Sequence, residues 1–162
     1  IAEITLFGLP TDPILLFVDN LRTSYNRKDL DFLKKVFSDD ALIISGRVIT
    51  EKVGDENSMM QSLPKKRYEL VKQSKTEYMT KMQQIFAANS YLNIKFEELK
   101  IVRHSKYPNY YGVSLKQYWN SSKYRDVGFV FLLIDFTDEA HPLIHVRTWA
   151  NDDIFNIGSF RI

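Results

Sequence analysis

The segment from Asp126 to Phe136 constrains the fold more than any other, because apolar side chains fill both alternating sets of its positions. Successive side chains of a β-strand point to opposite faces of the sheet, so a strand with this pattern is covered on both faces. We therefore predict that it lies at the centre of a sheet, with helices on one face. The other face needs a second subunit, a terminal segment or a neighbouring domain, because large exposed apolar patches promote association. A homodimer formed through the sheet is one expected outcome.

Capping residues and helical spacing predict three helices. Residues 12–25 begin with Asp-Pro, a common helix start, and their apolar residues recur at helical intervals. Asp29 is placed to cap a short second helix that ends near residues 38–40. Ser74 and Glu77 have the spacing of a capping box, which predicts the start of a third helix.

Strand signals dominate the rest of the chain. Alternating apolar and β-branched residues predict a strand from Ala41 to about Ile49. Residues 51–73 are mostly polar, and we interpret them as a long connection with one irregular strand from Tyr68. Turn-forming segments then separate four strands of a predicted antiparallel meander: Asn93–His104, Tyr110–Trp119, Asp126–Phe136 and Leu143–Ala150.

These elements predict one α+β domain over residues 1–162, a curved antiparallel sheet wrapped around the N-terminal helices and one further helix. Residues 1–11 and 152–162 are expected to be tethers or edge segments. The chain begins at Ile1 and not at a methionine, so removal of a signal peptide or an upstream domain is expected.

Charge and composition exclude several classes of partner. The chain has 22 Lys and Arg against 20 Asp and Glu, a balance too even to attract nucleic acid or an anionic membrane. The basic cluster at residues 65–67 is interleaved with acidic residues and is expected in a solvated loop, so nucleic-acid binding there is not favoured. No apolar run approaches the roughly 18 residues that span a bilayer. The chain has no Cys, which rules out disulfides and thiolate chemistry.

The strand Leu143–Ala150 has the face with the most functional chemistry. His145, Arg147 and Trp149 alternate along it, and Asp135 on the preceding strand could pair with His145 or Arg147. Such a pair would supply acid–base chemistry or hold a polar ligand, whereas the alternative is an ordinary charged pair or the polar rim of a dimer contact. The neighbouring strand would add aromatic and amide contacts from Tyr111, Gln117 and Trp119.

The histidines do not predict a metal site. His141 and His145 are four residues apart, which suits two ligands on a helix. On a strand, the same spacing separates them by roughly 13 Å, too far for one ion. We therefore expect no metal and no cofactor.

The order of elements resembles that of the nuclear transport factor 2-like superfamily, in which helices close a cone-shaped sheet. Residues 24–33 (Ser-Tyr-Asn-Arg-Lys-Asp-Leu-Asp-Phe-Leu) and 37–44 (Phe-Ser-Asp-Asp-Ala-Leu-Ile-Ile) carry this resemblance. Residues 111–117, Asp135 and residues 145–149 are also similar to uncharacterised proteins of gut Bacteroidetes. That similarity implies an exported bacterial protein.

The resemblance leaves two functions open, because the superfamily includes isomerases, dehydratases and cyclases beside members that only bind or dimerise. The first is a non-enzymatic binding or protein-interaction domain, with a cavity in the cone for a small apolar or mixed-polarity ligand. The second is a small-molecule isomerase, dehydratase or cyclase with Asp135 or His145 as base. In that enzyme Arg147 or Tyr25 would stabilise developing negative charge.

Overall fold

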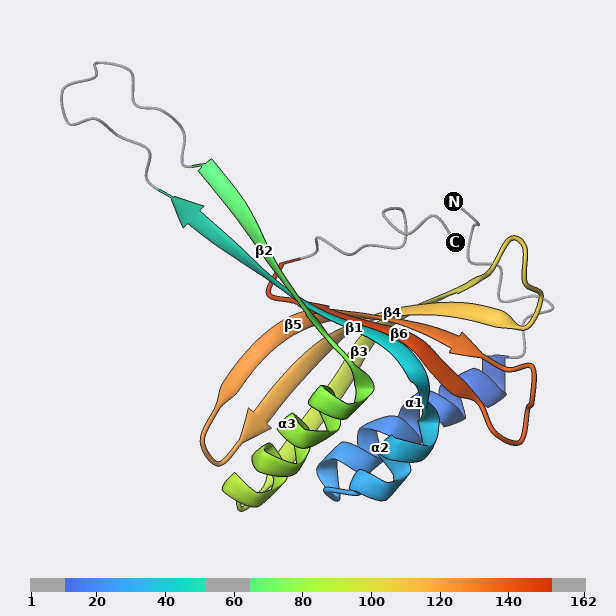
Figure 1. Cartoon of the computed structure of the whole chain (residues 1–162), viewed down its shortest axis with the longest axis horizontal. Helices are drawn as coiled ribbons and strands as arrows, with labels where there is room; N and C mark the ends of the chain where they lie inside the picture. Colours follow the sequence, from blue (N-terminus) through green and yellow to red (C-terminus); the bar gives the residue numbers. More distant parts are fainter. Residues whose placement is uncertain (1–10, 52–64, 153–162) are drawn as a thin grey trace.

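The described part of the chain, residues 11–51 and 65–152, places its helices on one face of a curved sheet in this computed structural model (Figure 1). The predicted α+β cone is confirmed. The elements in chain order are α1 (Thr11–Asn26), α2 (Leu30–Val36), β1 (Phe37–Glu51), β2 (Lys65–Gln73), α3 (Lys75–Ala88), β3 (Leu92–Arg103), β4 (Tyr110–Ser121), β5 (Arg125–Asp135) and β6 (Leu143–Ala150).

Local polar residues start the helices. The carboxylate of Asp29 accepts a hydrogen bond from the backbone N–H of Phe32 at 3.1 Å, which caps α2 as predicted. The side chains and backbones of Ser74 and Glu77 form the reciprocal capping box at the start of α3. The first helix begins at Thr11, so Asp12 lies within its first turn, where its negative charge still suits the helix dipole.

The sheet has the strand order β2-β1-β6-β5-β4-β3. Strands β3 to β6 form the predicted antiparallel meander. The β1–β6 pair is parallel, so the sheet is not antiparallel throughout. A parallel pair needs a long connection, and here residues 52–142 separate the two strands along the chain.

Strand β2 corrects the prediction of a loop around the basic cluster at residues 65–67. Its backbone pairs with β1 from Ile43↔Gln73 to Glu51↔Lys65, so the cluster lies on a regular strand. Together β1 and β2 extend away from the helices as a long two-stranded arm (Figure 1). Polar side chains are tolerated there because β2 is an edge strand with much of its surface exposed to solvent.

Strand β5 lies inside the sheet between β4 and β6, as its two apolar faces predict. Val130, Leu132 and Ile134 belong to the core beneath the helices, and each is at most 3% exposed. On the other face Phe131 is 1% exposed, whereas Val127 is 44% exposed. Burial on this outer face is therefore strongest at the middle of the strand.

No helix within residues 11–51 and 65–152 is both long and apolar enough to cross a membrane. The tethers or edge segments expected at residues 1–11 and 152–162 fall almost entirely outside the described residues.

Candidate functional site

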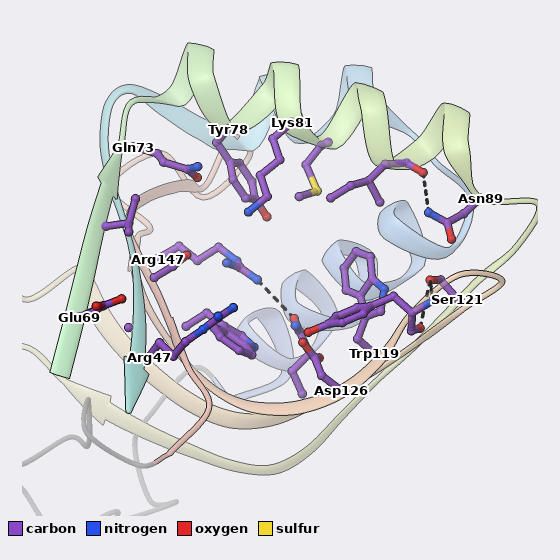
Figure 2. Close-up of a pocket in the computed structure, with 18 residues that line it drawn as sticks. Arg47, Glu69, Gln73, Tyr78, Lys81, Asn89, Trp119, Ser121, Asp126 and Arg147 are labelled. Atoms are coloured by element: carbon purple, nitrogen blue, oxygen red, sulfur yellow. Dashed lines mark hydrogen bonds between the residues drawn. The ribbon is translucent and has the colours of Figure 1, made fainter. Parts of the chain in front are cut away.

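A cavity of about 650 Å³ lies between α3 and the concave face of the sheet (Figure 2). Helix α3 contributes Tyr78 and aliphatic side chains, and the sheet contributes residues from β1, β2, β4, β5 and β6. Exposed charged residues Arg47, Glu69 and Lys81 lie at its edge. Four of the residues singled out in the sequence line this cavity, namely Gln117, Trp119, Arg147 and Trp149.

Arg147 places a positive charge in the buried part of this cavity. The side chain is 7% exposed, and its Nη2 donates a hydrogen bond to Oε1 of Gln117 at 3.3 Å. Its guanidinium carbon lies 5.4 Å from the centre of the Tyr78 ring, a cation–π contact. Burial disfavours the charge, but Tyr78, Tyr25 and Asp126 outweigh this effect and raise the pKa of Arg147, so the side chain stays charged.

Two tyrosine phenols lie beside the Arg147 guanidinium on the helical side of the cavity. The hydroxyls of Tyr25 on α1 and Tyr78 on α3 lie 2.6 Å apart, and both side chains are buried. Burial and the neighbouring Tyr78 raise the pKa of Tyr25 well above its ordinary value, so the Tyr25 phenol is neutral. Tyr25 also packs edge-on against Trp119, with the ring centres 6.5 Å apart.

Trp149 depends on a glycine of the adjacent strand. A Cβ atom placed on Gly128 would lie 2.1 Å from Nε1 of Trp149, closer than any real side chain allows. The indole therefore lies directly against the β5 backbone because Gly128 has no side chain there. Both tryptophans of the chain, Trp119 and Trp149, thus line one cavity.

Asp126 is a cavity residue that the sequence did not single out. Its carboxyl lines the same cavity as Arg147, and its Oδ1 atom is buried without a hydrogen-bond partner. Burial raises its pKa, although Tyr124 and Arg147 partly oppose this. The signal was present in the sequence, because Asp126 and Gly128 continue the inward-facing set that includes Val130.

Asp135 and His145 form a pair outside this cavity. His145 Nε2 lies 3.0 Å from Oδ2 of Asp135, and its Nδ1 lies 3.1 Å from the Ser38 hydroxyl. The imidazole also stacks on Tyr110, with ring centres 5.4 Å apart. Burial alone would raise the pKa of Asp135, but hydrogen bonds from Thr137 and His145 lower it.

An irregularity in strand pairing separates His145 from Arg147. On β6, Val146 pairs with Leu133 and Ile144 pairs with Ile134, so the register omits His145. Ile144 consequently joins the core, whereas unbroken alternation would have put His145 on the Arg147 face. Tyr111 also lies away from the cavity, where its ring packs against Phe136.

The pKa values of two aspartates on β5 are shifted in opposite directions, so substitution of each should change the free energy of unfolding in opposite directions. Asp126→Asn should raise the free energy of unfolding at neutral pH, because it removes a charge that burial disfavours. Asp135→Asn should lower that free energy by on the order of 1 kcal/mol, because it weakens hydrogen bonds to Thr137 and His145. Urea unfolding of both variants at neutral pH measures the difference.

The pH dependence of the free energy of unfolding provides the control for both substitutions. The stabilisation from Asp135 is present above its unfolded value near 3.8 and is lost as the pH falls through its lower folded pKa. Wild-type protein loses stability from Asp126 as the pH rises from 3.8 through its raised folded pKa, and Asp126→Asn abolishes that loss. Stability changes of the same sign in both variants would contradict these assignments.

Comparison with known proteins identifies relatives by structure only. No family model matches this chain, and no curated protein matches its sequence. Bd1075 from Bdellovibrio bacteriovorus aligns with 88% of this chain at a TM-score of 0.63 and 12% identity. The aligned region covers 41% of the Bdellovibrio protein.

Two further structures have lengths closer to that of this chain. A nuclear transport factor 2-like protein from Cytophaga hutchinsonii has a TM-score of 0.61 and 13% identity, covering 88% of this chain and 98% of its own. A Streptomyces avermitilis protein of the same family, provisionally described as a dehydratase, has a TM-score of 0.56 and 9% identity, covering 86% and 95%. Identities this low establish architecture and not activity. The chain has the nuclear transport factor 2-like fold.

Proposed function

We propose that this chain is a binding domain that holds a small molecule of mixed polarity inside its cone. The observation that carries the proposal is the cavity of about 650 Å³ with the buried Arg147 guanidinium and two indoles in its lining. Ligand sites are typically concave and mostly apolar, with a few placed polar groups, and their volumes are about 300 to 1,000 Å³. Met82 and Ile85 provide apolar lining, and Gln117 provides an oriented amide.

A neutral fluorescent compound tests occupancy of the cone. Phenylnaphthylamine should bind with one site per chain and quench Trp119 and Trp149, because both tryptophans of the chain line the cavity. Ser45→Phe should weaken this binding at least about tenfold, because a larger side chain at the cavity wall occupies the same space. Titration followed by tryptophan emission measures both effects.

The control for the neutral compound is Leu16→Phe, which adds an aromatic ring at an exposed position on α1 outside this cavity. It should leave the affinity unchanged. The absence of binding, or binding that Ser45→Phe does not weaken, would refute a ligand site in the cone.

The position and the raised pKa of Asp126 favour an enzyme as the second candidate function. A carboxyl with a pKa raised by burial, in one cavity with a cationic side chain, is suited to accept a proton while Arg147 stabilises negative charge on an oxygen. Asp135 and His145, the bases considered from the sequence, lie outside the cavity. The isomerase, dehydratase or cyclase alternative therefore rests on Asp126 here.

Deuterium exchange tests the enzyme without knowledge of its substrate. With acetonaphthone in heavy water, Asp126 would take a proton from the methyl carbon beside the carbonyl, and the resulting enolate would regain a deuteron. Asp126→Asn should lower the exchange rate by at least about 100-fold. Asp135→Asn is the matched control and should retain the wild-type rate, and exchange that survives in Asp126→Asn would exclude this role.

We also propose a homodimer formed through the outer face of the sheet. Leu42 on β1 and Tyr68 and Leu70 on β2 lie on this face and are 41%, 55% and 54% exposed. A second copy covering these apolar side chains would remove them from water.

Sedimentation equilibrium tests the dimer. The double variant Leu42→Lys, Leu70→Lys should weaken dimerisation at least about tenfold, because it places charges in the contact. Leu16→Lys, on α1 and 62% exposed, is the control and should leave association unchanged. A wild-type monomer at high micromolar concentration would refute the dimer.

We also propose export from a bacterial cell, which is what a similarity of residues 111–117 and 145–149 to uncharacterised proteins of gut Bacteroidetes would imply.

A further inference from the structure

The charge on Arg147 is not neutralised by the protein groups that contact it. Its contacts are the amide of Gln117 and the side chains of Tyr25 and Tyr78, none of which is a carboxylate. Among residues 11–51 and 65–152, no carboxylate forms an ion pair with its guanidinium. Burial of a charge without a paired opposite charge is strongly unfavourable. Tyr78, Tyr25 and Asp126 offset the effect of burial electrostatically, but no described carboxylate contacts the guanidinium, so a bound anion can still pair with it directly.

The guanidinium is also suited to one kind of anion. It has five N–H donors in a planar fork that matches the two oxygens of a carboxylate. One Nη2 donor bonds to Gln117, and the side chain lines the cavity in which further donors can reach a ligand. Figure 2 shows Arg147 between Tyr78 on the helical side and Asp126 and Trp119 on the sheet side. An acid group in the cavity would therefore meet the fork directly.

The rest of the lining indicates what the acid group is attached to. Trp119 and Trp149 provide aromatic surface, and Met82 and Ile85 on α3 provide apolar surface opposite the sheet. Because Gly128 lets the Trp149 indole lie against β5, the ring forms part of the cavity wall. A flat apolar body would pack on these surfaces and lose its contact with water.

Asp126 limits the charge of the ligand to one. Its carboxyl lines the same cavity and interacts electrostatically with Arg147. A dianion such as a phosphate monoester would place two negative charges beside this carboxyl, with Arg147 as the one buried cation among the described residues. A monoanion adds less negative charge beside this carboxyl and can still pair with Arg147.

We propose that the cone selects apolar organic monoanions, with a carboxylate-type head group on Arg147 and an aromatic or aliphatic body against Trp119 and Trp149. This inference rests on the proposed binding function and adds its chemical class. The ligand is a hydrophobic carboxylic acid rather than a neutral hydrophobic compound or a phosphate ester.

Two dyes with the same aromatic body separate this inference from the proposed function. Anilinonaphthalene sulfonate carries one permanent negative charge, whereas phenylnaphthylamine lacks the sulfonate and is neutral. Wild-type protein should bind the sulfonate at least about tenfold more tightly, as expected for hydrogen bonds to a charged group. Equal binding of both dyes would overturn the anion selectivity and leave the binding function intact, and the absence of binding by either dye would overturn both.

Substitution of Arg147 tests whether this residue causes the preference for the sulfonate dye over the neutral dye. Arg147→Met should reduce sulfonate affinity to that of the neutral dye, while neutral-dye affinity changes by no more than about twofold. Arg147→Lys should retain part of the preference, since the charge remains but the fork is lost. Circular dichroism identifies variants that are folded. A sulfonate preference that persists in folded Arg147→Met would refute the role of Arg147.

Lys81→Met is the control for a surface charge. Lys81 lies exposed at the cavity edge, so any effect of this variant on sulfonate affinity should disappear at high salt. The Arg147 effect should persist there, because buried charges are screened less. Naphthoate should displace the sulfonate dye competitively and naphthamide should do so at least about tenfold less well. Equal competition by the acid and the amide would overturn the carboxylate assignment.

Discussion

The pairing irregularity at His145 decides which side chains of β6 enter the cone. Because the register between β5 and β6 omits His145, Ile144 enters the core and Arg147 and Trp149 remain on the concave face. His145 instead joins Asp135 and Ser38 outside the cavity. One extra residue thus divides the polar groups of this strand between two environments.

The buried guanidinium of Arg147 interacts with the other polar groups of the cavity. Arg147 connects α3 to β4 through the Tyr78 ring and the Gln117 amide. The same charge acts on Asp126, whose pKa is raised by burial and only partly lowered by this neighbour. A cation and an acid of altered pKa in one cavity can bind an anion or transfer a proton, and the two candidate functions share this arrangement.

The outer face of the sheet has a different chemistry. Strands β1 and β2 present exposed Leu42, Tyr68 and Leu70 there, while their inward-facing residues Val71 and Ser45 line the cavity. Alternation along the same strands therefore places cavity-lining residues on one face and exposed apolar side chains on the other. The proposed ligand site and the proposed dimer contact therefore lie on opposite faces of the sheet.

Local sequence determined the caps at Asp29 and Ser74, the meander of β3 to β6 and the inward positions of Gln117 and Trp119. These features follow from capping and alternation, which act over a few residues. The parallel β1–β6 pair, the omission of His145 and the convergence of Asp126 with Arg147 were decided only in the tertiary structure. They depend on the register between strands, which packing across the whole sheet selects, and a one-residue shift in register moves a side chain to the opposite face.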